Sequence, residues 1–443
     1  MRRLLFIFSF LSLLVVDGKA QEVETLTLED CLRIGIDNNL SLEGKRKEIQ
    51  KSKYGVSENR SKLLPQITVI AGYNNNFDPP VSVTDGSSYG VPYNITKTLQ
   101  HTANAGLEMQ MPLFNQTLYT SMSIAKVMEE ISRLSYGKAR EDIIMQISKM
   151  YYLGQVTAEQ IVLIKANITR LEELRDITQA FFDNGMSMEV DLKRVNINLE
   201  NLKVQYDNAQ AMMKQQLNML KYIMDYPAEK EFVLTPVNTD SITTVALTGL
   251  SENIYELQLS QSQVQLAEKQ KKIISNGYIP SLSLTGSWRY AAYTDKGYHW
   301  FHSGPSNHWF LSYGLGLTLR IPIFDGLDKT YKIKKAMIDI ENSKLTWENA
   351  RKSLQTQYLN AVNDLMNNQR NFKKQKDNYL LAEDVYTVTS DRYREGIASM
   401  TEVLQDEMQM SEAQNNYISA HYNYRVTNLM LLKLTGQIES LVK

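Results

Sequence analysis

The stretch SLSLTGSWRY at residues 281–290 alternates large apolar side chains with polar ones, apart from Gly286 in an apolar position. The stretch LSYGLGLTLRI at residues 311–321 alternates in the same way. Successive side chains of a strand point to opposite faces, so each stretch predicts one apolar face and one polar face. About ten residues is also the length that a tilted strand needs to cross a bilayer. We therefore predict a membrane-spanning β-hairpin over residues 281–321. A soluble β-sandwich is the alternative to a membrane hairpin. The side chains of the polar face are mostly small, which favours the lumen of a membrane barrel over a sandwich.

The N-terminal half of the chain repeats this pattern, with weaker alternation over residues 67–73 and 103–111. Four landmarks in the same order at nearly constant separation indicate one duplicated unit. We expect a first repeat over residues 21–240 and a second over 241–443. Each repeat would contain a helix, a β-hairpin at about 66–111 or 281–321, and a long helical hairpin with its tip near 185 or 396. The landmark pairs are Pro65 and Pro280, Pro112 and Pro322, Gly185 and Gly396, and Tyr206 and Tyr417, which are 215, 210, 211 and 211 residues apart.

Long helices follow each predicted hairpin. Residues 115–182 contain no proline, and a helix of this length would extend roughly 100 Å. Apolar side chains then recur in alternating steps of four and three, a period that indicates coiled-coil packing. The heptad positions are Val195, Leu199, Leu202, Tyr206, Ala209, Met213, Gln216, Leu220 and Ile223 in the first repeat, and Leu354, Tyr358, Ala361, Leu365, Asn368, Phe372, Gln375, Tyr379, Ala382, Tyr386, Thr389 and Tyr393 in the second.

The composition describes a folded chain. Of its 443 residues, 43% are hydrophobic and 22% are charged, which excludes a disordered chain. The net charge of −1 and the lack of a strongly basic stretch argue against nucleic acid as a partner. The single cysteine, Cys31, excludes an intramolecular disulfide and is expected to be a buried small hydrophobe. No nucleophile motif, Walker loop or dinucleotide fingerprint is present, so we expect neither an enzyme nor a cofactor.

The N-terminus predicts export from the cytoplasm. Arg2 and Arg3 precede an apolar run over residues 4–16, and Gly18 and Ala20 supply small residues before a cleavage point. This pattern is typical of a secretory signal peptide over residues 1–20. No later stretch approaches 18 consecutive apolar residues, so we expect no transmembrane helix in the mature chain.

Two hairpins would supply only four membrane strands. Four strands cannot close a barrel, because the open edges would leave backbone groups unpaired in lipid. The smallest known membrane barrels have eight strands. Three copies of the chain would provide twelve strands and bring their long helices into one tube. The predicted fold class is therefore mainly α with membrane β: a trimeric 12-stranded β-barrel and an α-helical tunnel of coiled-coil helices.

The order and duplication of these motifs resemble the TolC-like outer-membrane factor family over essentially the whole mature chain. The resemblance implies a homotrimer whose β-barrel sits in outer-membrane lipid and whose helical tunnel crosses the periplasm. It also implies docking on a periplasmic adaptor (a membrane fusion protein) and an inner-membrane pump, with passive conduction of substrates outward. The residues that carry it are the junctions at Pro65 and Pro280, the strand exits at Pro112 and Pro322, the turns at Gly185 and Gly396, and the stretches 26–40 and 422–436.

The resemblance also implies functional positions. Glycine at the two turns would supply the left-handed backbone of a helix C-cap, and the family places both turns at the periplasmic tip where the adaptor docks. The acids that follow would narrow the tunnel entrance, although they could equally favour a helix N-terminus. The implied sets are Gly185, Met186, Ser187, Gly396, Ile397 and Ala398 at the tip, and Asp191, Tyr393, Glu402, Gln405 and Asp406 at a periplasmic gate.

Two departures from the family pattern affect this gate. Gln405 stands where relatives often have a second acid, with Asp406 beside it. Ala398 stands where some relatives have an arginine that shares a latch between Tyr393 and the position of Asp191. Arg392 and Arg394 are candidate replacements for that arginine. In the barrel, strand alternation places charged and polar side chains on the lumen face, namely Glu108, Gln110, Arg289 and Arg320.

Two rival functions remain open from the sequence. A periplasmic coiled-coil adaptor without a pore would explain the helices, but it has no use for four lipid-length strands. A secreted enzyme could use His299, His302 and His308 as metal ligands, since three histidines lie within ten residues. Their spacing fits no standard metal site, and the neighbouring Trp300 and Trp309 favour an aromatic girdle at a membrane interface. We therefore expect no metal.

Overall fold

The computed structural model describes residues 24–97, 99–236, 249–294 and 308–442. The expected signal peptide lies outside these residues. The chain divides into two compact units. The units do not coincide with the two sequence repeats, because each unit takes segments from both. Unit 1 comprises Met1–Leu40, Glu141–Gly249 and Leu359–Lys443, and unit 2 comprises Ser41–Arg140 and Leu250–Tyr358.

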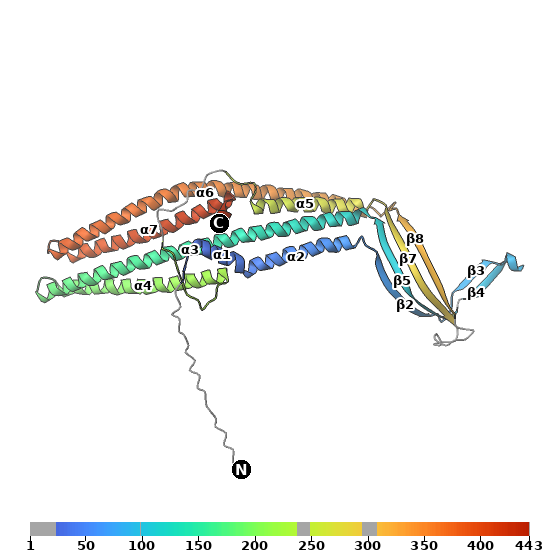
Figure 1. The fold of residues 1–443 in the computed structure, drawn as a ribbon. Coiled ribbons are helices and arrows are strands. Elements are labelled where there is room, and N and C mark those ends of the chain that lie inside the picture. The colour runs from blue at the N-terminus through green and yellow to red at the C-terminus, as the bar shows by residue number, and fades with distance from the viewer. Residues whose placement is uncertain (1–23, 98, 237–248, 295–307, 443) are drawn as a thin grey trace, which may run out of the picture. The chain divides into compact units, whose positions relative to one another are not determined.

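Unit 2 contains a four-stranded antiparallel sheet in the order β2-β5-β7-β8 (Figure 1). The central pair, β5 and β7, joins the first repeat to the second. Both stretches for which the sequence predicts a hairpin contain paired strands. The strands are β2 (Gln66–Asn75), β5 (His101–Phe114), β7 (Ser281–Thr294) and β8 (His308–Arg320).

The register separates the two faces of this sheet. Val69 lies opposite Leu107, Leu107 opposite Trp288, and Trp288 opposite Tyr313, so one face is apolar. The next residues across the sheet form the polar face, in the order Thr68, Glu108, Ser287 and Gly314. The apolar face is uncovered in the single chain, where Val69 and Tyr313 are each 78% exposed.

A second, shorter hairpin lies between β2 and β5, in a segment that the sequence analysis does not assign to any strand. It consists of β3 (Val81–Asp85) paired antiparallel with β4 (Tyr93–Lys97). The alternation of Val81 and Val83 with polar neighbours carried the signal for it, but each strand has only five residues. A 3-10 turn, η1 (Ser87–Tyr89), lies in the connection between them.

Helices adjoin the strands of unit 2. They are α2 (Leu40–Ser61) before β2, α5 (Tyr255–Asn276) before β7, and the first parts of α3 (Gln116–Asp183) and α6 (Asp328–Arg394). Asn276 donates a hydrogen bond to the hydroxyl of Thr120 and ties α5 to α3. The Tyr255 ring packs against Gly137, where a Cβ atom would collide with it.

Unit 1 contains two helical hairpins, formed by the later part of α3 with α4 (Glu189–Met224) and by the later part of α6 with α7 (Met400–Leu434) (Figure 1). All four helices contribute to one apolar cluster. The heptad positions predicted from sequence supply much of it, and this confirms the 3.5-residue pattern as the buried seam. The cluster contains Leu171, Leu174, Val195, Leu199, Leu202, Tyr386, Tyr393, Met400, Val403, Leu404 and Met410.

Short elements complete unit 1. Strand β1 (Glu24–Leu26) pairs in parallel with β6 (Phe232–Leu234), and α1 (Leu28–Asn38) begins at a capping box between Thr27 and Asp30. A 3-10 turn, η2 (Ile438–Val442), follows α7. Cys31 on α1 is fully buried, as expected from sequence. Among the residues that the structure describes, no helix combines the length and the apolarity needed to span a bilayer.

Candidate functional site

The first helical hairpin turns at Gly185. The backbone amide of Gly185 donates to the carbonyl of Phe182 at 2.9 Å, and that of Met186 donates to Phe181 at 2.8 Å. These are the two hydrogen bonds of a Schellman motif, which places its penultimate residue in the left-handed region. Gly185 has a φ of 72°, so the conformation predicted for this glycine is confirmed.

The second hairpin turns at Gly396 with the same geometry. Gly396 has a φ of 76°, and its amide donates to the Tyr393 carbonyl at 2.9 Å. The amide of Ile397 donates to Arg392 at 2.8 Å. Two turns 211 residues apart in sequence therefore end α3 and α6 identically. Their apolar tips project outward, since Met186 is 67% and Ile397 is 63% exposed.

A groove of about 690 Å³ lies between the two turns within unit 1. Both hairpins line it. Most of the positions predicted at the tip and gate take part, whereas Ile397, Glu402, Gln405 and Asp406 lie outside its lining. The predicted residues in the lining are Gly185, Met186, Ser187, Asp191, Tyr393, Gly396 and Ala398.

Asp191 and Tyr393 both line this groove, but each has another partner within the chain. Asp191 forms an ion pair with Arg194 at 3.2 Å, and Arg194 also donates to the Thr401 hydroxyl at 3.3 Å. The Tyr393 hydroxyl donates to Thr178 at 3.2 Å, and burial raises the pKa of this phenol. The arginine that contacts Asp191 is therefore Arg194, which was not among the candidates from the sequence.

Arg392 and Arg394 do not pair with Asp191. Arg394 instead contacts Glu173 at 3.3 Å and Asp391 at 3.5 Å. The cation of Arg394 therefore links α6 to α3.

Glu402 lies in the first turn of α7, where it closes a capping box. Its carboxylate accepts from the Ser399 amide at 3.1 Å, and its own amide donates to the Ser399 hydroxyl at 3.3 Å. This arrangement satisfies two amides that the helix cannot pair internally. In the single chain Glu402 thus has the helix-terminal role that the sequence left open. Its carboxylate remains exposed, as does the Gln405 side chain, while Asp406 is half-buried.

A buried polar layer between the helices was not predicted from sequence. Arg170 on α3 pairs with Glu383 on α6 at 2.9 Å and also donates to the Met410 sulfur at 3.2 Å. Glu407 on α7 is only 4% exposed, and its Oε1 atom has no hydrogen-bond partner. Burial raises the pKa of Glu407 to about 7, and the nearby charge of Arg170 opposes this rise.

A second polar group links α3 to α7. The Tyr417 hydroxyl donates to Glu159 at 2.9 Å, and the ring of His421, fully buried, lies 3.4 Å from the other carboxylate oxygen. Arg425 donates to the opposite nitrogen of His421 at 3.2 Å and stacks over the Tyr152 ring at 5.0 Å. Mutual hydrogen bonds between Asn167 and Gln414 join the same two helices. Polar bonds as well as apolar packing therefore hold the hairpins of unit 1 together.

The polar face of the sheet in unit 2 brings together two of the predicted lumen residues. Arg289 on β7 forms an ion pair of 2.6 Å with Glu108 on β5. Gln110 lies opposite Thr285 on the same face, and Arg320 lies opposite Ser281 at the end of β8. A concavity of about 590 Å³ over this face is lined by Glu108, Gln110 and Arg289 with small neighbours such as Thr68, Gly314 and Gly316.

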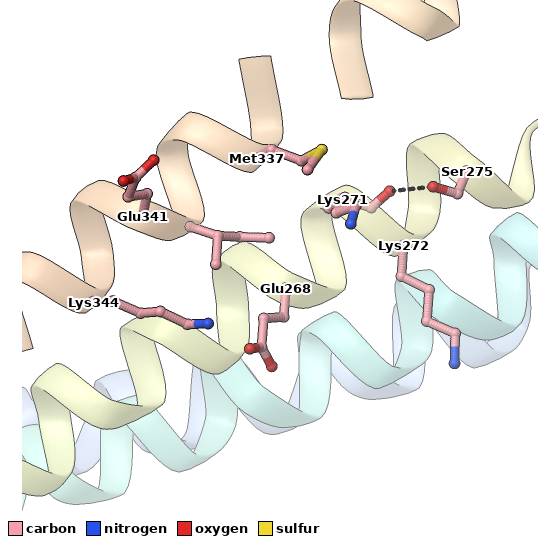
Figure 2. Close-up of a pocket in the computed structure, with 8 residues that line it drawn as sticks. Glu268, Lys271, Lys272, Ser275, Met337, Glu341 and Lys344 are labelled. Carbon is pink, nitrogen blue, oxygen red and sulfur yellow. Dashed lines mark hydrogen bonds between the residues drawn. The ribbon is translucent and has the colours of Figure 1, made fainter. Parts of the chain in front are cut away.

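A groove of about 660 Å³ in unit 2 lies between α5 and α6 (Figure 2). Charged side chains surround it, with Met337 and Ile340 from α6 as its apolar part. Ser275 bonds to the carbonyl of Lys271 in its own helix at 3.2 Å. The remaining lining residues are Glu268, Lys272, Glu341 and Lys344.

The proposed histidine site cannot be placed. His299 and His302 lie outside the described residues, and His308 is described only as part of β8. Among the residues that the structure does describe, no group of three or more His, Cys, Asp or Glu could hold a metal ion. Burial raises the pKa of the Cys31 thiol to about 12, which keeps it protonated and unreactive.

Comparison with known families gives one match that extends over most of the chain. The family model described as "Outer membrane efflux protein" matches residues 34–224 and 240–437. Similar proteins include outer membrane protein TolC of Vibrio cholerae, 21% identical over 86% of this chain and 84% of that protein. The probable efflux pump outer membrane protein TtgC of Pseudomonas putida is 24% identical over 81% of this chain and 75% of that protein.

Solved structures share the fold. A crystal structure of CusC aligns with a TM-score of 0.76 and 16% identity. It covers 96% of this chain and 95% of that chain. The outer-membrane channel OprN aligns with a TM-score of 0.75 and 14% identity, over 92% of this chain and 89% of that chain.

Proposed function

The chain belongs to the outer membrane efflux protein family, and from this membership we infer that it is the outer-membrane channel of an efflux or secretion system. It conducts substrates passively from a pump complex to the exterior and has no catalytic role of its own. The sheet of unit 2 carries this inference. Its four strands have one uncovered apolar face for lipid and one polar face, with the ion pair of Arg289 and Glu108, for a lumen.

Closure of the lumen requires more than one copy. Among the residues that the structure describes, β2 and β8 are the outer strands of the sheet β2-β5-β7-β8, and each has a neighbouring strand on one side. Unpaired backbone groups are too costly to leave in lipid, so a membrane sheet closes on itself. Three copies would supply twelve strands, a number within the range of known barrels. We propose a homotrimer with a 12-stranded barrel in the outer membrane and a periplasmic helical tunnel.

The turns at Gly185 and Gly396 are the proposed docking surface for a periplasmic adaptor. The support is their common geometry and the exposed apolar side chains of Met186 and Ile397. Asp191, Tyr393, Glu402, Gln405 and Asp406, with the tip groove, form the proposed gate. It opens when the two hairpins move apart, and an inner-membrane pump supplies the energy.

The rival function, a periplasmic adaptor without a pore, is tested by location and mass. We would fractionate membranes and measure the mass of the mature protein in detergent. A trimer in the outer membrane is expected. A stable soluble monomer would contradict the channel and leave the adaptor as the better explanation.

The gate is tested by tethering the two turns. Ser187 and Ser399 both line the tip groove. We expect the variant Ser187→Cys/Ser399→Cys to lose export on oxidation and recover it on reduction, while each single variant exports under both conditions. Export that continues through a fully bridged protein would exclude a gate at this place.

A further inference from the structure

The polar face of the sheet in unit 2 carries few charges. The register assigns alternate residues of each strand to this face, and along β8 the last of them is Arg320, opposite Ser281 on β7. The residues of β8 that precede it on this face are small, namely Ser312, Gly314, Gly316 and Thr318. Within the described part of the four strands, the Asp, Glu, Lys and Arg residues of this face are Glu108, Arg289 and Arg320.

Two of these three charges neutralise each other. The Nη2 atom of Arg289 lies 2.6 Å from the Oε1 atom of Glu108. At this separation the cation and the carboxylate act on a distant ion with nearly equal and opposite strength. The polar face therefore keeps one uncompensated charge per copy, which is that of Arg320.

Arg320 has no acidic partner among the residues that the structure describes, and its side chain is exposed. The charged residues that follow it in sequence pair with one another instead. Lys329 contacts Asp325 at 2.9 Å, and Lys332 contacts Asp328 at 2.7 Å. A guanidinium stays charged at every physiological pH and presents hydrogen-bond donors that match carboxylate and phosphate groups. Arg320 is therefore available to mobile anions.

Arg320 lies at the end of the sheet that adjoins the helices. Strand β8 ends at this residue, and α6 begins soon after it at Asp328. Arg289 lies opposite Ser312, which is eight residues before Arg320 on β8. Eight residues extend roughly 27 Å along a strand, or roughly 20 Å along the axis of a barrel with tilted strands. The Debye length is about 10 Å at 0.1 M salt, so the field of Arg320 is separate from that of the ion pair.

We propose that Arg320 from three copies forms a cationic ring at the helix-proximal rim of the barrel, and that this ring attracts anionic substrates. The inference rests on the proposed trimeric channel and names a substrate class for it. Twelve tilted strands about 4.8 Å apart would enclose a barrel roughly 24 Å in diameter. A solute crossing this rim would pass within roughly 12 Å of the wall, a distance close to the Debye length of about 10 Å at 0.1 M salt.

The ring has the opposite sign to the acids at the tip. The proposed gate presents the exposed carboxylate of Glu402, which would attract cations, whereas the rim would attract anions. A multivalent anion that enters from the barrel side reaches the rim before it reaches the tip. The contribution of Arg320 can therefore be measured separately from that of the gate.

Block of single-channel current by tripolyphosphate measures this attraction. Protein added to one chamber of a planar bilayer inserts its barrel and leaves its helices in that chamber, so tripolyphosphate is added to the opposite chamber. At 0.1 M salt, Arg320→Gln should raise the half-blocking concentration by about tenfold, because three cations no longer attract the multivalent anion. At 1 M salt, where the Debye length is about 3 Å, the unmodified channel and the variant should be blocked equally weakly.

Two further variants separate charge from structure. Arg320→Lys keeps the cation, so its half-blocking concentration should stay within about twofold of that of the unmodified channel. Glu108→Gln leaves the cation of Arg289 uncompensated and should strengthen the block. Equal block of Arg320→Gln and the unmodified channel at 0.1 M salt would overturn the ring, as would an equal loss in Arg320→Lys. An unmodified protein that forms no conducting channel would instead overturn the proposed function.

Discussion

Arg170 on α3 pairs with Glu383 on α6 across 2.9 Å, and this ion pair lies beside the buried carboxyl group of Glu407 on α7. The guanidinium of Arg170 thus has a carboxylate partner in Glu383. It also interacts electrostatically with Glu407, an acid whose pKa burial raises to about 7. The three side chains come from three different helices of unit 1. A change in the charge of Glu407 should therefore alter the stability of the contact between the two helical hairpins.

The first prediction concerns pH and Glu407. Its pKa is raised from 4.5 to about 7, so the folded chain binds this proton more tightly than the unfolded chain does. The stabilisation is complete below pH 4.5 and is lost as the pH rises through about 7. Between pH 5 and pH 8 the opening free energy of α7 should fall by about 2 to 3 kcal/mol. Amide hydrogen exchange over residues 403–411, corrected for intrinsic rates, measures it.

The variant Glu407→Gln should remove this pH dependence, because the neutral amide cannot ionise. Glu412→Gln is the matched control, since Glu412 is an exposed acid on the same helix. Its opening free energy should follow that of the unmodified protein. Equal pH profiles for all three proteins would show that Glu407 does not ionise in this range.

The second prediction separates the two roles of Glu402. Glutamine can still accept from the Ser399 amide, whereas alanine cannot, so Glu402→Ala should cost about 0.5 to 2 kcal/mol of local stability and Glu402→Gln much less. Both changes remove the charge. If a ring of these carboxylates attracts cations at the tunnel entrance, both variants should weaken block of single-channel current by multivalent cations. Unchanged block in Glu402→Gln would limit the residue to helix capping.

The third prediction concerns the tip turns. Gly185 and Gly396 have φ values of 72° and 76° with open space around them, so alanine would be strained by its backbone alone. We expect Gly185→Ala and Gly396→Ala each to cost about 1 to 2 kcal/mol. Gly44→Ala is the control, because Gly44 lies inside α2 with open space around it, and alanine there should stabilise by up to about 1 kcal/mol. Protease cleavage at the turns, compared with cleavage in α2, reports the difference.

The fourth prediction concerns Cys31. Its thiol is buried, and its pKa is raised to about 12, so almost no thiolate exists at neutral pH. The folded protein should resist maleimide labelling for hours, and the unfolded protein should label within minutes. Mass spectrometry of the labelled chain measures both. Rapid labelling of the native protein would mean that α1 detaches from unit 1.

Sequence periodicity predicts the larger elements well. Alternation of Leu315, Leu317 and Leu319 with small residues locates β8, and heptad spacing locates Leu199 and Leu202 in the core. Both patterns repeat over many residues, so a few exceptions do not obscure them. The left-handed glycines were predictable because helices commonly end in a left-handed residue, which is usually glycine.

Individual polar contacts were not predictable. Glu407 looks like any other acid of a polar helix, and only the packing of three helices shows that it turns inward. The pair of Arg194 with Asp191 is a three-residue step within α4, a spacing that the sequence does show, whereas the contact of Arg194 with Thr401 on α7 depends on packing. The hairpin of β3 and β4 was missed because five residues give too short an alternation to stand out. Polar contacts between helices depend on which helix faces pack together in the folded chain, and the sequence of a single helix does not contain this information.

Each compact unit takes segments from both sequence repeats, and this has a consequence for biogenesis. Neither unit can finish folding when only the first repeat has emerged, because unit 1 needs α7 and unit 2 needs β7 and β8. Strands β2 and β5 are therefore synthesised before β7 and β8, the strands that complete their sheet. The sheet stays incomplete until about two hundred further residues have been synthesised. The nascent chain then depends on chaperones that bind those strands and prevent their aggregation in an aqueous compartment.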